Sequence, residues 1–230
     1  MIKPYYDKEG ITIYNADCRD ILPHLEPVDL VLTDPPYEIE AHTKRITRAK
    51  MEGRATHKDM IIDFDPISEE LRTFIVNIKS NGWLLIFSQV EAVGLYASLA
   101  NKNWRRGMVW IKPDCAPSFN GDRPAQGFES ICAIWKGNGR SIWNSCGKRG
   151  VYYANCTDYK HEHQTQKPLK LIYQLIKDFL IGNTILDPFM GSGTTLVAAK
   201  QLGRKCIGIE IEEKYCQIAV DRLRQKVLPL

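Results

Sequence analysis

The chain has 230 residues with 44% hydrophobic and 25% charged side chains, which suits one globular domain with a sizeable core. It contains no apolar run near the roughly 18 residues of a membrane helix and no apolar signal core at its start, so we expect a cytoplasmic protein without a membrane partner. The net charge of +4 is compatible with a polyanionic partner, although many unrelated enzymes have a similar charge.

Short β-branched runs alternate with amphipathic runs along the chain. In chain order, strands are predicted at 11–14, 28–33, 83–87, 104–111, 130–135, 184–186 and 205–210. Helices are predicted at 68–79, 91–100, 168–181, 196–202 and 212–226. Asn81-Gly82 is expected to turn the chain into the strand that follows it. The alternation predicts an α/β fold, a mostly parallel sheet that helices cover on both faces.

Two segments, 38–62 and 136–163, have no steady hydrophobic period. The first is expected to be a loop, and it contains a block of basic side chains: Lys44, Arg45, Arg48, Lys50, Arg54 and Lys58. Such a block is either a solvated loop or, on a nucleic-acid enzyme, the segment that contacts phosphates. The second segment is rich in glycine, asparagine, cysteine and aromatic residues.

The cysteines indicate free thiols rather than a disulfide framework or a metal site. There are seven of them, an odd number, and none forms a C-x-x-C pair. Cys146 and Cys156 could be combined with His161 and His163, but that spacing matches no standard zinc pattern. We therefore expect no metal.

A glycine-rich turn, L-D-P-F-M-G-S-G-T-T, joins a predicted strand to a predicted helix. Gly191 and Gly193 permit backbone angles and a close approach that a Cβ would block. Glu210 ends the next strand, 19 residues after Gly191, where an acid commonly binds a ribose. The turn lacks the third glycine of a dinucleotide site and the lysine of a nucleotide triphosphate site. Together with Asp187 and Phe189, it favours S-adenosylmethionine (AdoMet), an adenosine ligand without phosphates.

The tetrapeptide Asp34-Pro-Pro-Tyr37 directly follows a predicted strand. An exocyclic amino nitrogen is a poor nucleophile because its lone pair is delocalised into the base. Asp34 and the carbonyl of Pro35 could accept its hydrogens from rigid positions, and Tyr37 could stack on an extruded base. Methylation of cytosine carbon needs a cysteine nucleophile, which this tetrapeptide lacks; Cys115 lies on a different loop. These residues favour direct amino methylation.

On these motifs, the chain resembles the β group of amino-methylating DNA methyltransferases of bacteria and phages, in which D-P-P-Y precedes the AdoMet loop. The resemblance extends over nearly the whole chain and includes N-A-D-C at 15–18, G-W-L-L-I-F at 82–87, W-I-K-P at 110–113, F-E-S at 128–130, H-Q-T-Q-K-P at 163–168, C-I-G-I-E at 206–210, Tyr215, Ala219 and Arg222. Gln164 stands where the family usually has proline, which affects only the path of that loop.

The resemblance implies roles for three sets of residues. The catalytic set is Asp34, Pro35, Pro36 and Tyr37. The cofactor set is Asp17, Cys18, Thr165, Lys167, Asp187, Phe189, Gly191, Gly193, Thr194 and Glu210. The expected DNA contacts are Lys44, Arg45, Arg48 and Arg54. Within the cofactor set, Asp17 is implied to contact the adenine of AdoMet, and Thr165 and Lys167 to lie near its amino-acid end.

The implied fold is the Rossmann-like AdoMet-dependent methyltransferase fold, a mostly parallel seven-stranded sheet with helices on both faces, circularly permuted. Residues 1–230 are expected to form a single methyltransferase domain that contains the basic loop 38–62 and a target-recognition insert at 136–163. The insert is short for this group, so either the basic loop contributes to recognition or the recognised site is short.

The implied function is transfer of a methyl group from AdoMet to adenine N6 of a flipped-out base in duplex DNA, as in restriction-modification. The alternatives are cytosine-N4 methylation, in which Ser-Pro-Pro-Tyr is more common; an RNA or protein amino-group methyltransferase; and a non-catalytic DNA-binding relative. Double-stranded DNA is the expected partner. A homodimer and a cognate restriction endonuclease are further partners that the resemblance admits.

Overall fold

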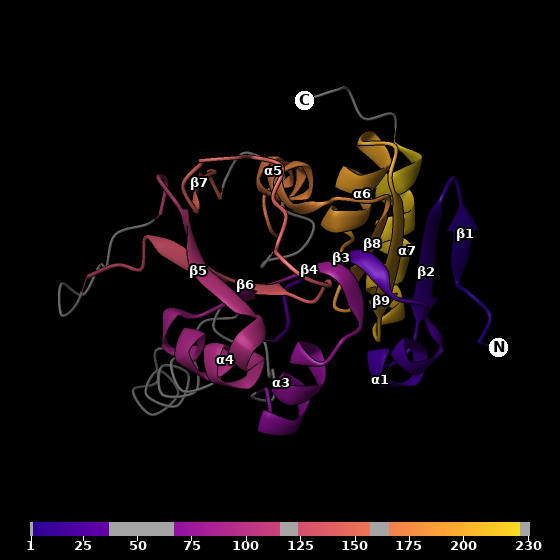
Figure 1. Ribbon diagram of the computed structural model, residues 1–230. Helices are drawn as coiled ribbons and strands as arrows, with labels where there is room; N and C mark the ends of the chain where they lie inside the picture. Colours follow the sequence, from indigo (N-terminus) through magenta and orange to yellow (C-terminus); the bar gives the residue numbers. More distant parts are fainter. Residues whose placement is uncertain (1, 37–66, 116–123, 157–165, 226–230) are drawn as a thin grey trace, which may run out of the picture.

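Nine strands form one mixed sheet in the computed structural model, which describes residues 2–36, 67–115, 124–156 and 166–225 (Figure 1). The strands are β1 (Tyr6–Lys8), β2 (Ile11–Asn15), β3 (Val28–Thr33), β4 (Ser80–Ser88), β5 (Trp104–Ile111), β6 (Phe128–Trp135), β7 (Val151–Tyr153), β8 (Thr184–Asp187) and β9 (Lys205–Glu210). Their order in the sheet is β1-β2-β9-β8-β3-β4-β6-β5-β7. Strands β2, β9, β8, β3 and β4 are parallel, and β6 runs antiparallel to both of its neighbours.

The predicted α/β fold is therefore confirmed, with two strands more than the seven expected. The additional strands are β1 and β7, which lie at the two edges of the sheet and have three residues each. Runs of this length are too short to produce an alternating pattern in the sequence. Strand β3, which leads into D-P-P-Y, precedes β8 in the chain, as the permuted order requires.

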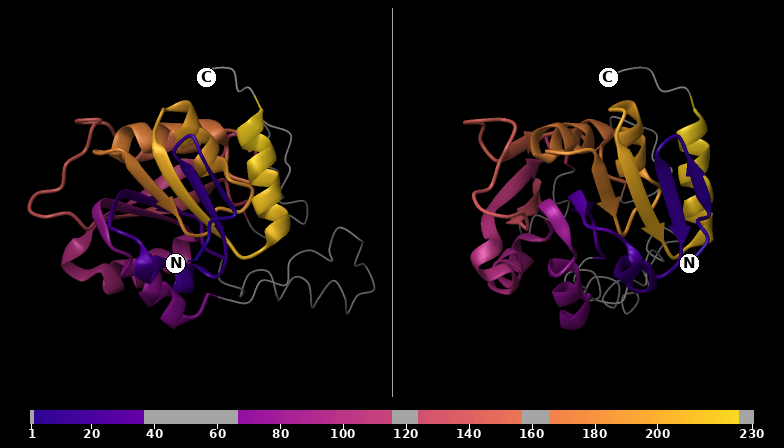
Figure 2. Two further views of the ribbon diagram at one scale, coloured as in Figure 1. Left: turned by 90° about the vertical axis from the view of Figure 1, so that its right-hand side faces the viewer. Right: turned by 45° about the vertical axis from the view of Figure 1, so that its right-hand side comes forward.

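Helices cover both faces of the sheet, as predicted (Figures 1 and 2). Helices α1 (Cys18–Ile21), α3 (Glu69–Val76) and α4 (Val93–Ala100) pack on one face, and α5 (Leu169–Phe179), α6 (Thr194–Gln201) and α7 (Glu213–Arg224) on the other. In β3, Leu30 and Leu32 face the second group of helices while Val31 faces the first. A strand buried on both faces has a continuous apolar run, which explains V-D-L-V-L-T. No helix of the described residues has the length and apolar character needed to span a membrane.

The predicted turn at Asn81-Gly82 is wrong, because both residues lie inside β4. Gly82 is needed there for a different reason: a Cβ at this position would lie 2.2 Å from the carbonyl oxygen of Asp29 on the neighbouring strand. The other differences are at element ends. Helix α3 ends at Val76, three residues earlier than predicted, and α4 begins at Val93 after a short 3-10 turn.

The connections of β3 and β8 diverge where these two strands lie side by side. The chain leaves β3 through α3 on one face to reach β4, and leaves β8 through α6 on the other face to reach β9. Ligands of α/β proteins bind at the carboxyl ends of strands that diverge in this way. At the amino ends, the Asp29 carboxylate accepts hydrogen bonds from the backbone of Asn183 (2.8 Å) and Thr184 (2.9 Å), which aligns β8 beside β3.

Candidate active site

Asp34 and Lys167 form an ion pair at this divergence point, although 133 residues separate them in the sequence. Asp34 follows the last residue of β3, and Lys167 lies two residues before α5. The distance from Lys167 Nζ to Asp34 Oδ2 is 2.5 Å, and the Lys167 side chain is only 8% exposed. The ammonium group also lies 5.1 Å from the centre of the Phe87 ring. A buried ammonium is stable in such a place only beside anions.

Glu129 provides a second anion for Lys167. Its Oε2 atom lies 3.3 Å from Lys167 Nζ, and its Oε1 atom pairs with Lys112. Burial alone would lower the pKa of Lys167, but Asp34 and Glu129 outweigh it and raise that pKa. The ammonium is therefore held charged next to Asp34. Sequence reasoning placed Lys112 and Glu129 in the W-I-K-P and F-E-S motifs but assigned neither of them a role.

The glycine turn after β8 has the conformation that its glycines predict. Gly191 and Gly193 have φ values of +51° and +79°, in the left-handed region that side chains disfavour. A Cβ on Gly193 would also lie 2.7 Å from the Cβ of Ala219 in α7. The turn starts at Asp187, whose carboxylate accepts hydrogen bonds from Thr195 Oγ1 (2.6 Å) and from the backbone of Phe189 (3.2 Å).

Carboxylates from neighbouring strands gather at this edge of the sheet. Burial raises the pKa of Asp187 to about 7, with Asp34 and Glu210 adding to the effect. Burial likewise raises the pKa of Glu210, whose carboxylate accepts hydrogen bonds from the backbone of Gly191 (3.1 Å) and Glu212 (2.9 Å). A nearby cation stabilises the ionised form of such buried carboxyl groups. This edge of the sheet therefore favours a positively charged ligand.

Arg222 connects the glycine turn to α7. Its guanidinium group donates hydrogen bonds to the Ser192 carbonyl oxygen (2.6 Å) and to Thr194 Oγ1 (3.2 Å). Ser192 Oγ in turn contacts Gln166 Oε1 at 3.3 Å, next to Lys167. The turn and the segment that carries Lys167 are thus held together.

The structure places the described members of both predicted sets at the carboxyl edge of the sheet. These are Asp34, Pro35, Pro36, Asp17, Lys167, Asp187, Phe189, Gly191, Gly193, Thr194 and Glu210. Asp17 follows β2, beside the end of β9, and caps α1. Cys18 is different: its side chain is buried in the core under α1, so a cofactor contact from Cys18 would come from its backbone.

The remaining predicted site residues lie outside the described residues: Tyr37, Lys44, Arg45, Arg48, Arg54 and Thr165. So does the whole basic loop 38–62, and so do residues 157–163 of the predicted insert. Within the described ranges, no group of three or more His, Cys, Asp or Glu side chains is arranged to hold a metal ion.

Comparison with known proteins identifies the family. The family model N6_N4_Mtase, described as a DNA methylase, matches residues 28–221. The chain belongs to this DNA methylase family. The match includes D-P-P-Y and the glycine turn; Asp17 precedes it, and Arg222 lies one residue beyond its end.

Two curated relatives of this DNA methylase are similar over nearly its whole length. The chain is 30% identical to the type II methyltransferase M2.DpnII of Streptococcus pneumoniae over 251 residues, which is 97% of this chain and 93% of that protein. It is 29% identical to M.HinfI of Haemophilus influenzae over 245 residues, which is 93% of this chain and 68% of that protein.

Solved structures have the same fold. The complex of M1.HpyAVI with SAM has a TM-score of 0.70 and 27% identity, and the match covers 94% of this chain and all of that one. The cytosine-N4-specific PvuII DNA methyltransferase has a TM-score of 0.72 at 14% identity, over 98% of this chain and 90% of that one, which shows the fold alone.

Proposed function

We propose that this DNA methylase transfers the methyl group of AdoMet to adenine N6 of a base flipped out of duplex DNA. The observation that carries the proposal is the position of Asp34, one strand away from the glycine turn. Strands β3 and β8 pair in parallel, with Val31 opposite Leu186, so D-P-P-Y and the glycine turn leave the sheet at the same edge.

The residues of this edge fit AdoMet. The left-handed glycines 191 and 193 leave room for a ligand against the backbone, and Glu210 ends the strand where an acid binds a ribose. Asp187 and Glu210 favour a cation, whereas the Asp34 charge is already paired with Lys167. AdoMet carries a sulfonium and an ammonium group. When bound, AdoMet supplies an electrophilic methyl group and needs no metal.

The acceptor side of the reaction depends on Asp34 and Pro35. Asp34 accepts a hydrogen bond from the amino group of the target base, and the carbonyl of Pro35 accepts the second. Both acceptors are held rigidly, since β3 ends directly before them and proline fixes the backbone angle. With both hydrogens held, the nitrogen lone pair points toward the methyl donor, and Asp34 is the group that takes the proton. Tyr37 is proposed to stack on the base.

Adenine is the proposed base because the tetrapeptide begins with Asp. Cytosine-N4 methylation uses the same chemistry and is the second candidate. RNA or protein amino groups are a third, and methylation of duplex DNA, RNA and protein measured side by side with labelled AdoMet separates them. Nucleoside analysis of the labelled DNA then distinguishes N6-methyladenine from N4-methylcytosine.

The catalytic role of Asp34 is tested with Asp34→Asn. This isosteric variant is expected to bind AdoMet within about twofold of the original chain and to lose methyl transfer by at least roughly a thousandfold. Isothermal titration measures the binding, and a labelled AdoMet assay on mixed genomic DNA measures the transfer. Turnover that is undiminished in this variant contradicts the role of Asp34.

Three predictions about the setting remain: the cytoplasmic location, a homodimer and a cognate restriction endonuclease. Fractionation of the source cells tests the first. Light scattering of the purified protein tests the second. For the third, the expected result is that DNA methylated by this enzyme resists an endonuclease that cleaves the unmethylated site.

A further inference from the structure

Four charged side chains alternate in sign at the carboxyl edge of the sheet. Lys112 pairs with Glu129, Glu129 lies 3.3 Å from Lys167, and Lys167 lies 2.5 Å from Asp34. The chain of charges runs from the end of β5 through the start of β6 to the end of β3. The side chains of Lys112, Glu129 and Lys167 are at most 17% exposed, so water screens their interactions only weakly.

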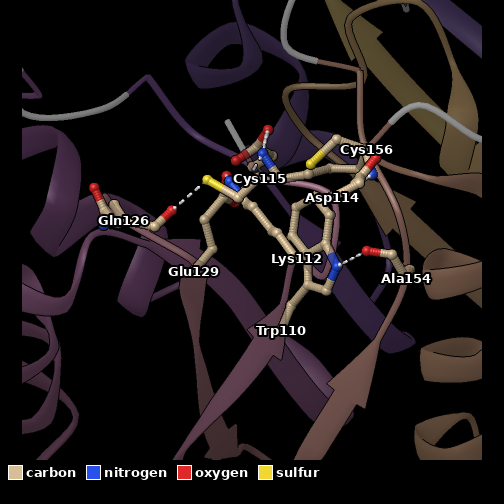
Figure 3. A network of polar contacts seen from close by, with 10 residues as sticks. Trp110, Lys112, Asp114, Cys115, Gln126, Glu129, Ala154 and Cys156 are labelled. Atoms are coloured by element: carbon tan, nitrogen blue, oxygen red, sulfur yellow. Dashed lines mark hydrogen bonds and ion pairs between the residues drawn. The ribbon is translucent and has the colours of Figure 1, made fainter. Parts of the chain in front are cut away.

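Glu129 is held in a defined position by the strands around it (Figure 3). It lies opposite Trp110 in the β5–β6 ladder, and Lys112, two residues further along the chain, donates its backbone N–H to the Gly127 carbonyl at 2.8 Å. The Trp110 indole donates a hydrogen bond to the Ala154 carbonyl at 2.9 Å, which fastens the segment after β7 to the same place.

Sharing an ammonium group between two carboxylates weakens its interaction with each of them. Lys167 divides its hydrogen bonds between Asp34 and Glu129. If Glu129 became neutral, Lys167 would interact more strongly with Asp34, and the proton affinity of Asp34 would fall. Asp187 also lies near Asp34 and acts in the same direction as Glu129 when it is ionised, which the raised pKa of Asp187, about 7, restricts to the upper part of the pH range.

We propose that Glu129 is a positioning residue for methyl transfer: it shares Lys167 with Asp34 and thereby keeps Asp34 a strong acceptor for the amino hydrogen of the base. Lys112 limits this effect, because it neutralises part of the Glu129 charge. The two residues therefore act on Asp34 in opposite directions through the same ammonium group. This inference rests on the proposed catalytic role of Asp34.

The test is the pH profile of the single-turnover methyl-transfer rate, with DNA that carries the site mapped by modification-aware sequencing. The acidic limb of that profile reports protonation of Asp34 in the complex. In Glu129→Gln, we expect the limb to move to lower pH by about one unit and the plateau rate to fall about tenfold. In Lys112→Met, which keeps the aliphatic stem, we expect the limb to move to higher pH. Glu129→Asp keeps the charge and is expected to restore most of the original profile.

Asp178→Asn is the matched control. Asp178 is another buried acid that pairs with a lysine, Lys148, at 2.5 Å, but it lies near the far end of α5 from Lys167. Its loss is expected to lower stability and, by loosening the predicted recognition insert, to change DNA affinity. At saturating DNA it should not move the acidic limb. If Glu129 only supported the fold, Glu129→Gln and Lys112→Met would behave like this control, and limbs that coincide with the original profile overturn the proposal.

The proposed function fails by a separate result. If Asp34→Asn transfers methyl groups at the original rate, Asp34 is not the acceptor. If Asp34→Asn is inactive while neither Glu129→Gln nor Lys112→Met shifts the limb, only the role of Glu129 is wrong.

Discussion

Asp187 combines a structural and an electrostatic role in one buried side chain. It is 5% exposed and fixes the start of the glycine turn through Thr195 and the backbone of Phe189. Burial raises its pKa from 3.8 to about 7. The same carboxyl group therefore holds the turn through hydrogen bonds and is difficult to ionise in the folded chain.

The pH dependence of stability follows from this shift. Between about pH 4 and pH 7, the folded chain keeps a proton on Asp187 that the unfolded chain has already lost. Stability should therefore fall as pH rises through that window, by at most roughly 4 kcal/mol at 1.36 kcal/mol per pH unit. Asp187→Asn, which cannot ionise, should lack this fall.

Urea unfolding without AdoMet, at about pH 5 and about pH 8, measures the free energy of unfolding of the original chain and of Asp187→Asn. The change with pH that only the original chain shows is the contribution of Asp187. Glu210, whose pKa burial also raises, contributes in the same direction to both. A fall of equal size in Asp187→Asn and in the original chain would contradict the assignment.

At the scale of elements, the described part of the predicted recognition insert is anchored to α5. Asp178 accepts hydrogen bonds from Ser145 Oγ (2.5 Å) and the Tyr152 hydroxyl (2.9 Å) and pairs with Lys148. The ring of Trp143 stacks on that of Phe179, with centres 5.6 Å apart. Burial, together with the Asp178 charge, raises the pKa of Tyr152, so its hydroxyl remains a donor. A single acid on a helix thus holds a segment that has no hydrophobic period of its own.

Replacing Asp178 with Asn should release this segment. We expect a loss of about 2–4 kcal/mol in the free energy of unfolding, because three donors lose a buried anion. Hydrogen exchange should rise most in residues 144–152. Glu9→Gln serves as the control: Glu9 pairs with Lys200 at 2.7 Å but is 67% exposed, so its loss should lower the free energy of unfolding far less than the loss of Asp178. Unchanged exchange in 144–152 would show that aromatic packing alone holds the segment.

At the scale of the whole molecule, Asp34 and the glycine turn lie at one edge of the sheet, and exposed cationic side chains lie at the opposite edge. The basic loop 38–62 lies outside the described residues and follows D-P-P-Y directly in the sequence, and we propose that it contacts DNA beside the target base. By contrast, Lys8, Arg204 and Lys205 lie at the amino ends of β2 and β9, on the opposite edge. For DNA binding, the positions of the cationic side chains are therefore more informative than the net charge of +4.

This contrast gives a matched test of DNA binding. Replacing Lys44, Arg45 and Arg48 with Ala should weaken DNA binding and reduce the slope of log K against log salt by roughly 0.9 for each phosphate that the loop no longer neutralises. Replacing Lys8, Arg204 and Lys205 removes the same charge and should leave the slope nearly unchanged. Fluorescence anisotropy across a salt series measures both. Equal slopes for the two triple variants would mean that the loop is only solvated.

The sequence alone determined those features whose cause is local. The apolar runs of β3 and β4 predict buried strands, the left-handed Gly191 and Gly193 are required by a tight strand–helix turn, and Asp34 is followed by prolines that fix its backbone. Each of these depends on neighbouring residues, so its pattern is visible in a short stretch of chain. The fold class follows from them, and so does the prediction that the glycine turn holds a cofactor.

Tertiary structure alone decided which distant groups meet. The pairing of Lys167 with Asp34, the position of Glu129 between two lysines and the approach of Gly82 to Asp29 join residues from different strands and loops. The hydrophobic period and composition of a short segment do not predict these contacts, because the contacts depend on the order and register of the strands. Order and register are fixed only when all strands pack into one sheet with both faces buried. The same holds for the short edge strands β1 and β7, which form because longer strands offer them backbone partners.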